Sequence, residues 1–425
     1  MVAALPLMLL DIKDPRPDAP AWNAIPAQSP DSLDTVDVAV RMLFVENDAD
    51  TLFFFARLMM VAVALVLGVF IFKWSQDLFG MSAAIVSLFI YALDPNILAY
   101  SQLVHTDLPF AACFFIGSYY FCRALDRLDR YNLAMTVVCF ALAAITKYSY
   151  TVMFFVWMVL GTIKIFSSQP LEFCVTKSRV LADRWRKASM VGLVLVCALL
   201  GAYLLVWAVY GFRFAAVPGG MMPLALADEL PQLAPLRTLF AYLAQRHWFP
   251  EAWIYGQLHA FGALGRDIYL LGANSIGKGF WLYFPTAFAV KTPVPTLLLL
   301  CGTIFLWLTG RTSWRQSVTL LAPAIVYFVV AVVSGINIGL RHIISIYPFI
   351  FVVLGGGVAQ LWNSARTTPR CALAVGAVWY VLSALLAYPH YLVLTEKVRL
   401  RDLDISVSYE YRNLSAEFSW VFISC

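Results

Sequence analysis

A series of long apolar runs, separated by short polar or charged turns, determines what this chain can fold into. Hydrophobic residues make up 61% of its 425 positions and charged residues 13%, whereas soluble domains contain about 45–50% and about 25%. A helix that crosses a membrane needs about 20 apolar residues, and roughly ten runs approach that length once their aromatic flanks are included. The sequence therefore predicts an all-α fold, a polytopic transmembrane helical bundle. The runs are Leu58–Phe72, Met81–Leu93, Leu108–Cys122, Leu133–Ile145, Thr151–Ile165, Met190–Tyr210, Val294–Leu308, Val318–Val333, Ile343–Leu361 and Ala372–Ala387.

Lysine and arginine residues are concentrated in the turns on one side of this predicted bundle. The net charge of +5 is small, so the basic residues indicate membrane topology, and no nucleic-acid partner is expected. Their face is assigned to the cytoplasm, because short cytoplasmic loops are rich in Lys and Arg. We predict an integral, multi-pass protein of a bacterial inner membrane or an ER-type membrane, with a periplasmic or lumenal active face. That face receives residues 1–51, 94–107, 147–150, 212–292 and 335–342 and the C-terminal tail.

The alternation of spans and loops divides the chain into five expected parts. They are a non-cytoplasmic loop remnant with surface helices (1–56), an N-terminal transmembrane bundle (57–211), a non-cytoplasmic loop region with membrane-surface helices (212–292), C-terminal transmembrane helices (293–388) and a divergent tail (389–425). The eight cysteines mostly lie inside apolar runs and form no C-x-x-C pair, so we expect small buried side chains and no metal cluster. The first ten residues lack the basic start of a cleavable signal peptide.

Two carboxylates and a histidine are expected at one mouth of a membrane hairpin. Asp94-Pro95-Asn96 ends the run Met81–Leu93, because Pro fixes φ and pushes the preceding residue out of the α region. His105-Thr106-Asp107 precedes the run Leu108–Cys122, as a helix N-cap would. Burying a charge near a membrane is costly, which favours a functional role for these side chains. The alternative is that both aspartates only end and cap helices.

The stretch from Asp94 to Pro109, DPNILAYSQLVHTDLP, resembles the second outside loop of the polyprenyl-phosphate-sugar-dependent glycosyltransferases with a GT-C fold. These are the relatives of the protein O-mannosyltransferases and of the aminoarabinose transferase that acts on lipid A. Their pattern is Asp-Pro-Asn, then Ala-His-Ser, then Thr-Thr-Asp; here Tyr100 replaces the His and His105 the first Thr. Further matches lie at Lys147-Tyr148-Ser149, Gly277–Pro295 and Asn337–Pro348, so the resemblance covers most of Leu5–Leu392.

The resemblance implies a hexosyl- or pentosyltransferase that takes a polyprenyl-phosphate sugar lipid as donor and a protein, lipid or glycan as acceptor. In the family, a first transmembrane helix and an Asp-Glu pair, whose Asp is taken as the general base, precede the point where this chain begins. Two alternatives therefore stay open. One is a catalytically dead fragment of such an enzyme, and the other is a polytopic transporter or lipid flippase, which would carry charges near the middle of broken helices.

Candidate site residues follow from what this reaction needs. The donor phosphate requires cations near the membrane interface, and Arg offers a permanently charged, forked set of donors. We assign phosphate binding to Arg341, His342, Lys147 and Lys278. The acceptor hydroxyl needs a carboxylate that accepts its proton, and our choices are Asp107 and then Asp94. No cofactor is required by the sequence; a divalent metal is left open, with His105 and Asp107 as its weak candidate ligands.

Overall fold

The computed structural model describes residues 2–13, 40–175, 178–215, 234–262, 268–270, 272–275, 279–309, 314–363, 367–388 and 391. Within these residues the regular elements are helices apart from five very short strands. Five helices are long and apolar enough to cross a membrane, and two bent helix pairs raise the number to seven. Three further apolar helices, Arg130–Thr146, Tyr150–Phe166 and Thr319–Ser334, are shorter. These features confirm the predicted all-α, polytopic membrane fold.

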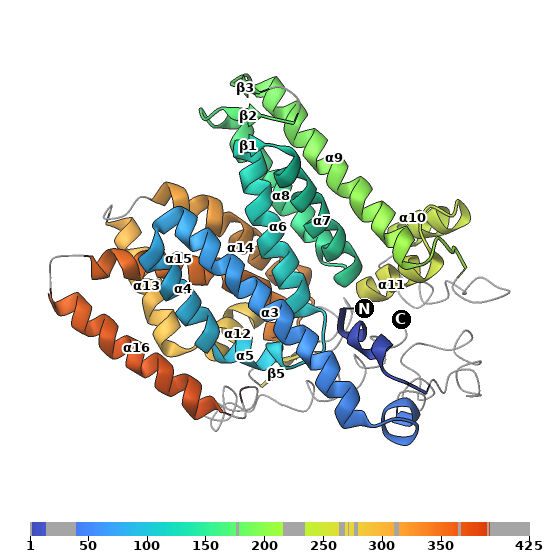
Figure 1. The fold of residues 1–425 in the computed structure, drawn as a ribbon, viewed down its shortest axis with the longest axis horizontal. Coiled ribbons are helices and arrows are strands. Elements are labelled where there is room, and N and C mark those ends of the chain that lie inside the picture. Colours follow the sequence, from blue (N-terminus) through green and yellow to red (C-terminus); the bar gives the residue numbers. More distant parts are fainter. Residues whose placement is uncertain are drawn as a thin grey trace.

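The long helices coincide with the apolar runs of the sequence (Figure 1). Several begin at an aspartate just before the first helical residue; the side chains of Asp48, Asp129 and Asp183 accept hydrogen bonds from backbone N–H groups of the first turn, as N-caps do. The helices are α3 (Ala49–Phe79), α4 (Met81–Leu93), α6 (Asp107–Asp126), α7 (Arg130–Thr146), α8 (Tyr150–Phe166), α9 (Arg184–Val209), α13 (Val294–Leu308), α14 (Trp314–Ser334), α15 (Tyr347–Trp362) and α16 (Thr367–Ala387).

Shorter elements lie at the ends of these helices. A small sheet joins β1 (Arg127–Leu128) in parallel to β2 (Leu171–Phe173), which pairs antiparallel with β3 (Arg179–Leu181). A second pair, β4 (Ile268–Leu270) and β5 (Ala273–Ser275), is antiparallel. Short helices complete the fold: η1 (Val2–Ala4), η2 (Pro6–Leu9), η4 (Arg41–Val45), α5 (Pro95–Ser101), α10 (Ala234–Gln245), α11 (Glu251–Gly262), α12 (Tyr283–Lys291) and η8 (Leu340–Ile346).

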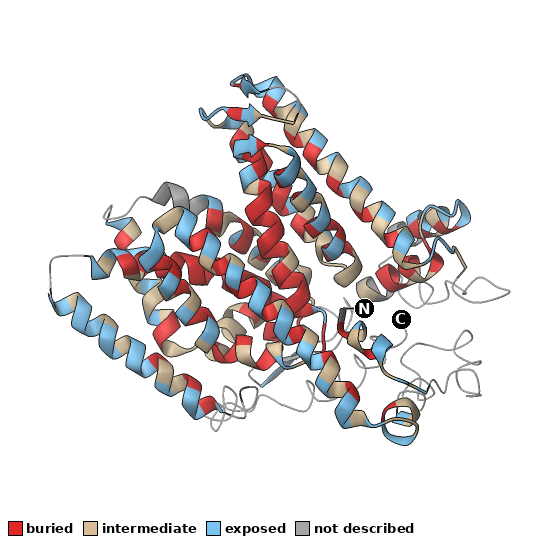
Figure 2. Ribbon diagram, in the orientation of Figure 1, coloured by how far each residue is buried: buried red, intermediate tan, exposed pale blue. Residues whose placement is uncertain are grey.

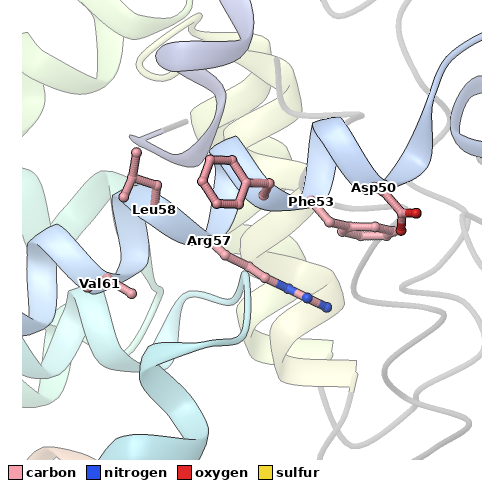
Figure 3. Close-up of a pocket in the computed structure, with 6 residues that line it drawn as sticks. Asp50, Phe53, Arg57, Leu58 and Val61 are labelled. Atoms are coloured by element: carbon pink, nitrogen blue, oxygen red, sulfur yellow. The ribbon is translucent and has the colours of Figure 1, made fainter.

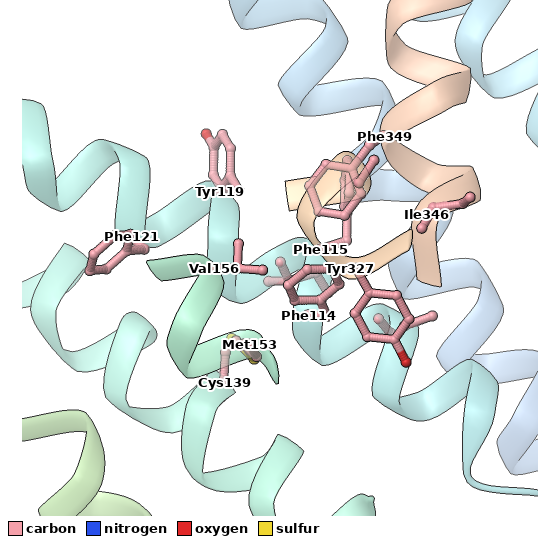
Figure 4. Close-up of a cluster of buried hydrophobic side chains, with 14 of the residues drawn as sticks. Phe114, Phe115, Tyr119, Phe121, Cys139, Met153, Val156, Tyr327, Ile346 and Phe349 are labelled. Atoms are coloured by element: carbon pink, nitrogen blue, oxygen red, sulfur yellow. The ribbon is translucent and has the colours of Figure 1, made fainter. Parts of the chain in front are cut away.

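Aromatic side chains of α6 fill the centre of the bundle. Phe114 and Phe115 lie against Phe349 of α15, with ring centroids 5.3 and 5.0 Å apart (Figure 4). Phe121 stacks on Trp157 of α8, with ring centroids 4.6 Å apart. Figure 2 shows that α6 and α15 are buried, whereas α16 and much of α9 are exposed. Because lipid is as apolar as these rings, close packing between helices stabilises the core more than release of water does.

Two helix breaks lie against each other near the start of α6. The axis bends by 62° between α4 and α5, where Pro95 follows Asp94, and by 111° between α12 and α13, where Thr292 and Pro293 intervene. The side-chain amide of Asn96 donates to the Lys291 carbonyl, 3.0 Å away, and joins the two breaks. This bond satisfies a carbonyl that the broken helix leaves without an intrahelical donor, which is the condition for irregular backbone in a membrane bundle.

Candidate functional site

The centre of the candidate site is a buried ion pair between two helix ends. Asp107 is the first residue of α6, and Lys147 is the residue that ends α7. The Lys147 ammonium donates to Oδ1 of Asp107, and the two side chains are 16% and 5% exposed. Burial opposes the charge on the Lys147 ammonium, but the adjacent carboxylate outweighs this effect, and the pKa of Lys147 lies above its ordinary value. Lys147 therefore carries its charge at neutral pH.

His105 supports this pair from the loop before α6. Its Nδ1 accepts a hydrogen bond from the backbone N–H of Asp107 at 2.9 Å, and its Nε2 lies 3.0 Å from the Tyr100 carbonyl. Because Nδ1 accepts, Nε2 must carry the ring proton and donate to that carbonyl. Both ring nitrogens of His105 are thus engaged by the protein. Among the described residues, no three His, Cys, Asp or Glu side chains gather as a metal site would require.

Arg341 approaches the pair from the C-terminal half of the chain. It is the second residue of η8, which begins directly after Gly339; the φ of 93° at Gly339 is a left-handed conformation that favours glycine. Its Nε donates to the Ile338 carbonyl at 3.0 Å, and its charge acts on both Asp107 and Lys147. The structure therefore brings together Asp107, Lys147 and Arg341, which the sequence had assigned to one site from three separate segments.

The ring of His342, the next residue, lies against two aromatic side chains. His342 is buried, and its ring stacks on Phe284 of α12 at 5.6 Å and lies 6.4 Å from the ring of Tyr327. Its Nδ1 has no hydrogen-bond partner within the described part of the chain. Sequence reasoning missed Tyr327, which lies close enough to Lys147 and Asp107 to interact with both electrostatically. A hydroxyl inside the apolar run Val318–Val333 was the signal that could have identified it.

Asp94 makes contacts with other parts of the chain than Asp107 does. It is fully buried, and one carboxylate oxygen accepts from the backbone N–H groups of Asn96 and Ile97 at 3.0 and 3.1 Å, which caps α5. The hydroxyl of Tyr380 donates to the Ile90 carbonyl at 2.8 Å and lies 3.4 Å from the second Asp94 oxygen. Asp94 thus connects α16 to the helix break between α4 and α5. These contacts match the capping alternative, and a catalytic role for Asp94 stays a prediction.

Substitution of Asp94 can separate these two roles. Asp94→Ala removes the cap and leaves buried N–H groups unsatisfied, so we expect a loss of about 2 kcal/mol or more in the free energy of unfolding. Asp94→Asn keeps an oxygen acceptor and should stay close to the parent protein, since Asn is an equally good cap. Denaturant unfolding of the purified protein measures both variants. Equal stability of the two would contradict the capping role, and loss of sugar transfer in a stable Asp94→Asn protein would favour a catalytic one.

The fourth phosphate candidate, Lys278, lies outside the described residues. The residues after it, Gly279 and Phe280, are bound to the loop that leads to Arg341. The backbone N–H of Phe280 donates to Oδ1 of Asn337 at 2.6 Å. A Cβ on Gly279 would lie 2.7 Å from the same oxygen, so only glycine permits this approach. Asn337 therefore connects two of the segments that the sequence assigned to the donor site.

A separate pocket of about 390 Å³ lies along the N-terminal part of α3 (Figure 3). Its described lining comes from one face of that helix and includes the exposed side chains of Phe54 and Leu58. Arg57 lies over the ring of Phe53, with 5.4 Å between the guanidinium carbon and the ring centroid. None of the charged residues around Asp107 lines this pocket, so it is distinct from the candidate site.

Comparison with known proteins bears on this site. Residues 43–200 match the sequence model of the family described as dolichyl-phosphate-mannose-protein mannosyltransferase. This segment contains Asp94, His105, Asp107 and Lys147 but ends before Arg341, so the match is shorter than the resemblance proposed from the sequence. No curated protein matches the chain.

Two solved structures of the Archaeoglobus fulgidus oligosaccharyltransferase are similar to this chain. The form tethered to an acceptor peptide is 14% identical with a TM-score of 0.39, and the apo form is 12% identical with a TM-score of 0.38. Each comparison covers 90% of this chain but only 46% and 47% of the other. This chain thus spans about half the length of those proteins. Over residues 43–200 the chain is thus similar to the dolichyl-phosphate-mannose-protein mannosyltransferase family, and the described part of the chain has five to seven helices that could cross a membrane.

Proposed function

We propose that this chain is a membrane glycosyltransferase that moves a sugar from a polyprenyl-phosphate donor to an acceptor on the non-cytoplasmic side. The observation that carries the proposal is the convergence of Lys147 and Arg341 on Asp107 at the ends of membrane helices. When the sugar leaves, its phosphate becomes a free anion. Fixed cations in a site of low dielectric stabilise such a charge more strongly than they would in water.

The ion pair suggests how donor binding and proton removal are coupled. A carboxylate held by an ammonium is a weak proton acceptor. A donor phosphate that draws the Lys147 ammonium away from Asp107 would leave the carboxylate able to accept the proton of the acceptor hydroxyl as the sugar transfers. Asp107 is therefore assigned as the carboxylate at the reacting centre, and Lys147 and Arg341 as the phosphate-binding groups.

The basic residues support the non-cytoplasmic side for this site. The end of α6 opposite Asp107 leads into β1, and the end of α7 opposite Lys147 follows β1. The N-terminal end of α9 follows β3 (Figure 1). Around this sheet lie basic side chains that sequence topology assigns to the cytoplasm. They include Arg123, Arg127, Arg130, Lys164, Arg179, Arg184, Arg186 and Lys187. Asp107 lies at the opposite end of α6, one helix length away from this sheet.

A transfer assay in proteoliposomes tests the proposal. Purified protein is mixed with synthetic polyprenyl-monophosphate donors carrying labelled mannose, another hexose or aminoarabinose, and with peptide, lipid or glycan acceptors. We expect the label to reach one acceptor class from a monophosphate donor and not from nucleotide sugars. Failure of every monophosphate donor, in protein that remains folded, would overturn the proposal.

One observation favours a second candidate function, a lipid flippase. The two helix breaks joined by Asn96 are a feature that transporters share. The same proteoliposomes distinguish the functions, because a flippase would move the labelled donor between leaflets without transferring its sugar. Such movement without any glycosylated product would replace the transferase proposal.

A further inference from the structure

The hairpin formed by α10 and α11 is packed directly on the turn that carries Lys147. The hairpin and the bundle share a hydrophobic cluster that is separate from the main core. Trp253 of α11 is at its centre, stacked on Phe249 with ring centroids 4.5 Å apart and edge-on to Tyr148 at 6.2 Å. The other members are Val206, Phe240, Ala244, Ile254 and Leu258, with Ile145, Tyr150, Tyr210 and Leu243 at the edge.

Gly256 of α11 provides the space into which Tyr148 fits. A Cβ at this position would overlap the Tyr148 hydroxyl and would lie 2.8 Å from Cζ of the same ring. Real side chains do not approach so closely, so any larger residue would displace the ring or the hairpin. The contact is thus possible only with glycine.

Tyr148 is connected to Lys147 by a tight turn. Lys147 is extended, with φ −154° and ψ 138°, and its carbonyl accepts from the backbone N–H of Tyr150 at 3.1 Å. Its own N–H donates to the Ala143 carbonyl at 3.0 Å. The backbone of Lys147 is therefore fixed on both sides, and a shift of Tyr148 must be absorbed within the turn that directs the Lys147 side chain toward Asp107.

From these contacts we propose that Tyr148 is a positioning residue, which holds Lys147 against Asp107 only while α11 is docked through Gly256. The order of contacts is Gly256 to Tyr148, Tyr148 to the turn, and Lys147 to Asp107. The α10–α11 hairpin then controls the geometry of the donor site without touching the donor. The inference deepens the proposed function, since it takes Lys147 as a donor-phosphate ligand, but its structural part can be tested without any transfer assay.

The test compares Gly256→Ala with a matched control, Gly302→Ala. A Cβ on Gly302 in α13 meets nothing within 4 Å. The readout is the rate at which an amine-reactive acetylating ester modifies Lys147, measured by mass spectrometry. Lys147 should react slowly in the parent protein, because its amine is paired and its pKa is raised. We expect Gly256→Ala to increase this rate by about threefold or more, and Gly302→Ala to leave it unchanged. Lys164, paired with Asp126 near β1, is the internal reference in each protein.

A double-mutant cycle shows whether Gly256 acts through Tyr148. Tyr148→Ala removes the ring without creating a clash. If Gly256→Ala does not fold, Tyr148→Ala takes its place in the labelling test. We expect Tyr148→Ala to raise the labelling rate of Lys147, and Gly256→Ala to cause no further increase in a protein that already carries Tyr148→Ala.

In an active preparation, Gly256→Ala should raise the KM for the donor more than it lowers kcat. If the labelling rate of Lys147 is unchanged in folded Gly256→Ala or Tyr148→Ala, the inference is overturned. If the labelling rate rises as expected but no sugar is transferred, only the proposed function is overturned.

Discussion

Asp107→Asn is expected to lower sugar transfer by about 10²–10⁴-fold, the usual contribution of a general base. The same substitution leaves the buried Lys147 ammonium without its carboxylate, and loss of one partner of a buried pair costs about 3–5 kcal/mol of folding free energy. Transfer and stability should therefore fall together. Initial rates in proteoliposomes and denaturant unfolding of the purified protein measure the two effects separately.

The double variant Asp107→Asn/Lys147→Met separates catalysis from folding. It removes both charges and replaces the ammonium by an apolar side chain of similar length, so most of the lost stability should return. Transfer should stay low, because neither the base nor the phosphate ligand is restored. Recovery of transfer together with stability would show that Asp107 has a structural role alone.

Arg341→Ala should raise the KM for the donor by about 10- to 100-fold, since hydrogen bonds to charged groups are worth about 1.5–3 kcal/mol. Arg341→Lys should recover only part of this loss, because an ammonium keeps the charge but not the forked donor geometry that suits a phosphate. The measurement is the donor dependence of the initial rate.

Arg370→Ala is the matched control for Arg341. Arg370 also donates through Nε to a backbone carbonyl, that of Trp362 at 2.7 Å, but it is an exposed residue near the start of α16. Its replacement should leave the donor KM unchanged. If Arg341→Ala and Arg370→Ala behave alike, Arg341 is not a phosphate ligand.

The helices of this fold could be predicted from hydropathy, and several of their boundaries are marked by residues with a strong local effect. Pro95 after Asp94, and the capping aspartates before α3, α7 and α9, act over only a few residues and can be read directly. The charged cluster could be predicted in part, because alternating spans bring the loops of Asp107, Lys147 and Arg341 to one end of the bundle.

The contacts within the cluster could not be predicted, because they depend on packing between helices that are distant in sequence. Hydropathy does not show that Tyr327 of α14 lies near Lys147, or that Tyr380 of α16 reaches Asp94. The proximity of Gly256 to Tyr148 is equally hidden, since a glycine in a short helix ordinarily signals weak helix propensity. Sequence spacing defines the ends of helices, and only the packed structure defines which ends meet.

The shortness of α7 and α8 has a consequence for the surrounding lipid. Each has 17 residues and a length of about 25 Å, whereas the hydrocarbon layer is about 30 Å thick. Local thinning of the bilayer is one way in which a hydrophobic mismatch of this size is relieved. Lys147 lies where the two helices meet, so the headgroup layer should dip toward it. The deformed membrane itself would then bring lipid phosphates to the depth of this ammonium.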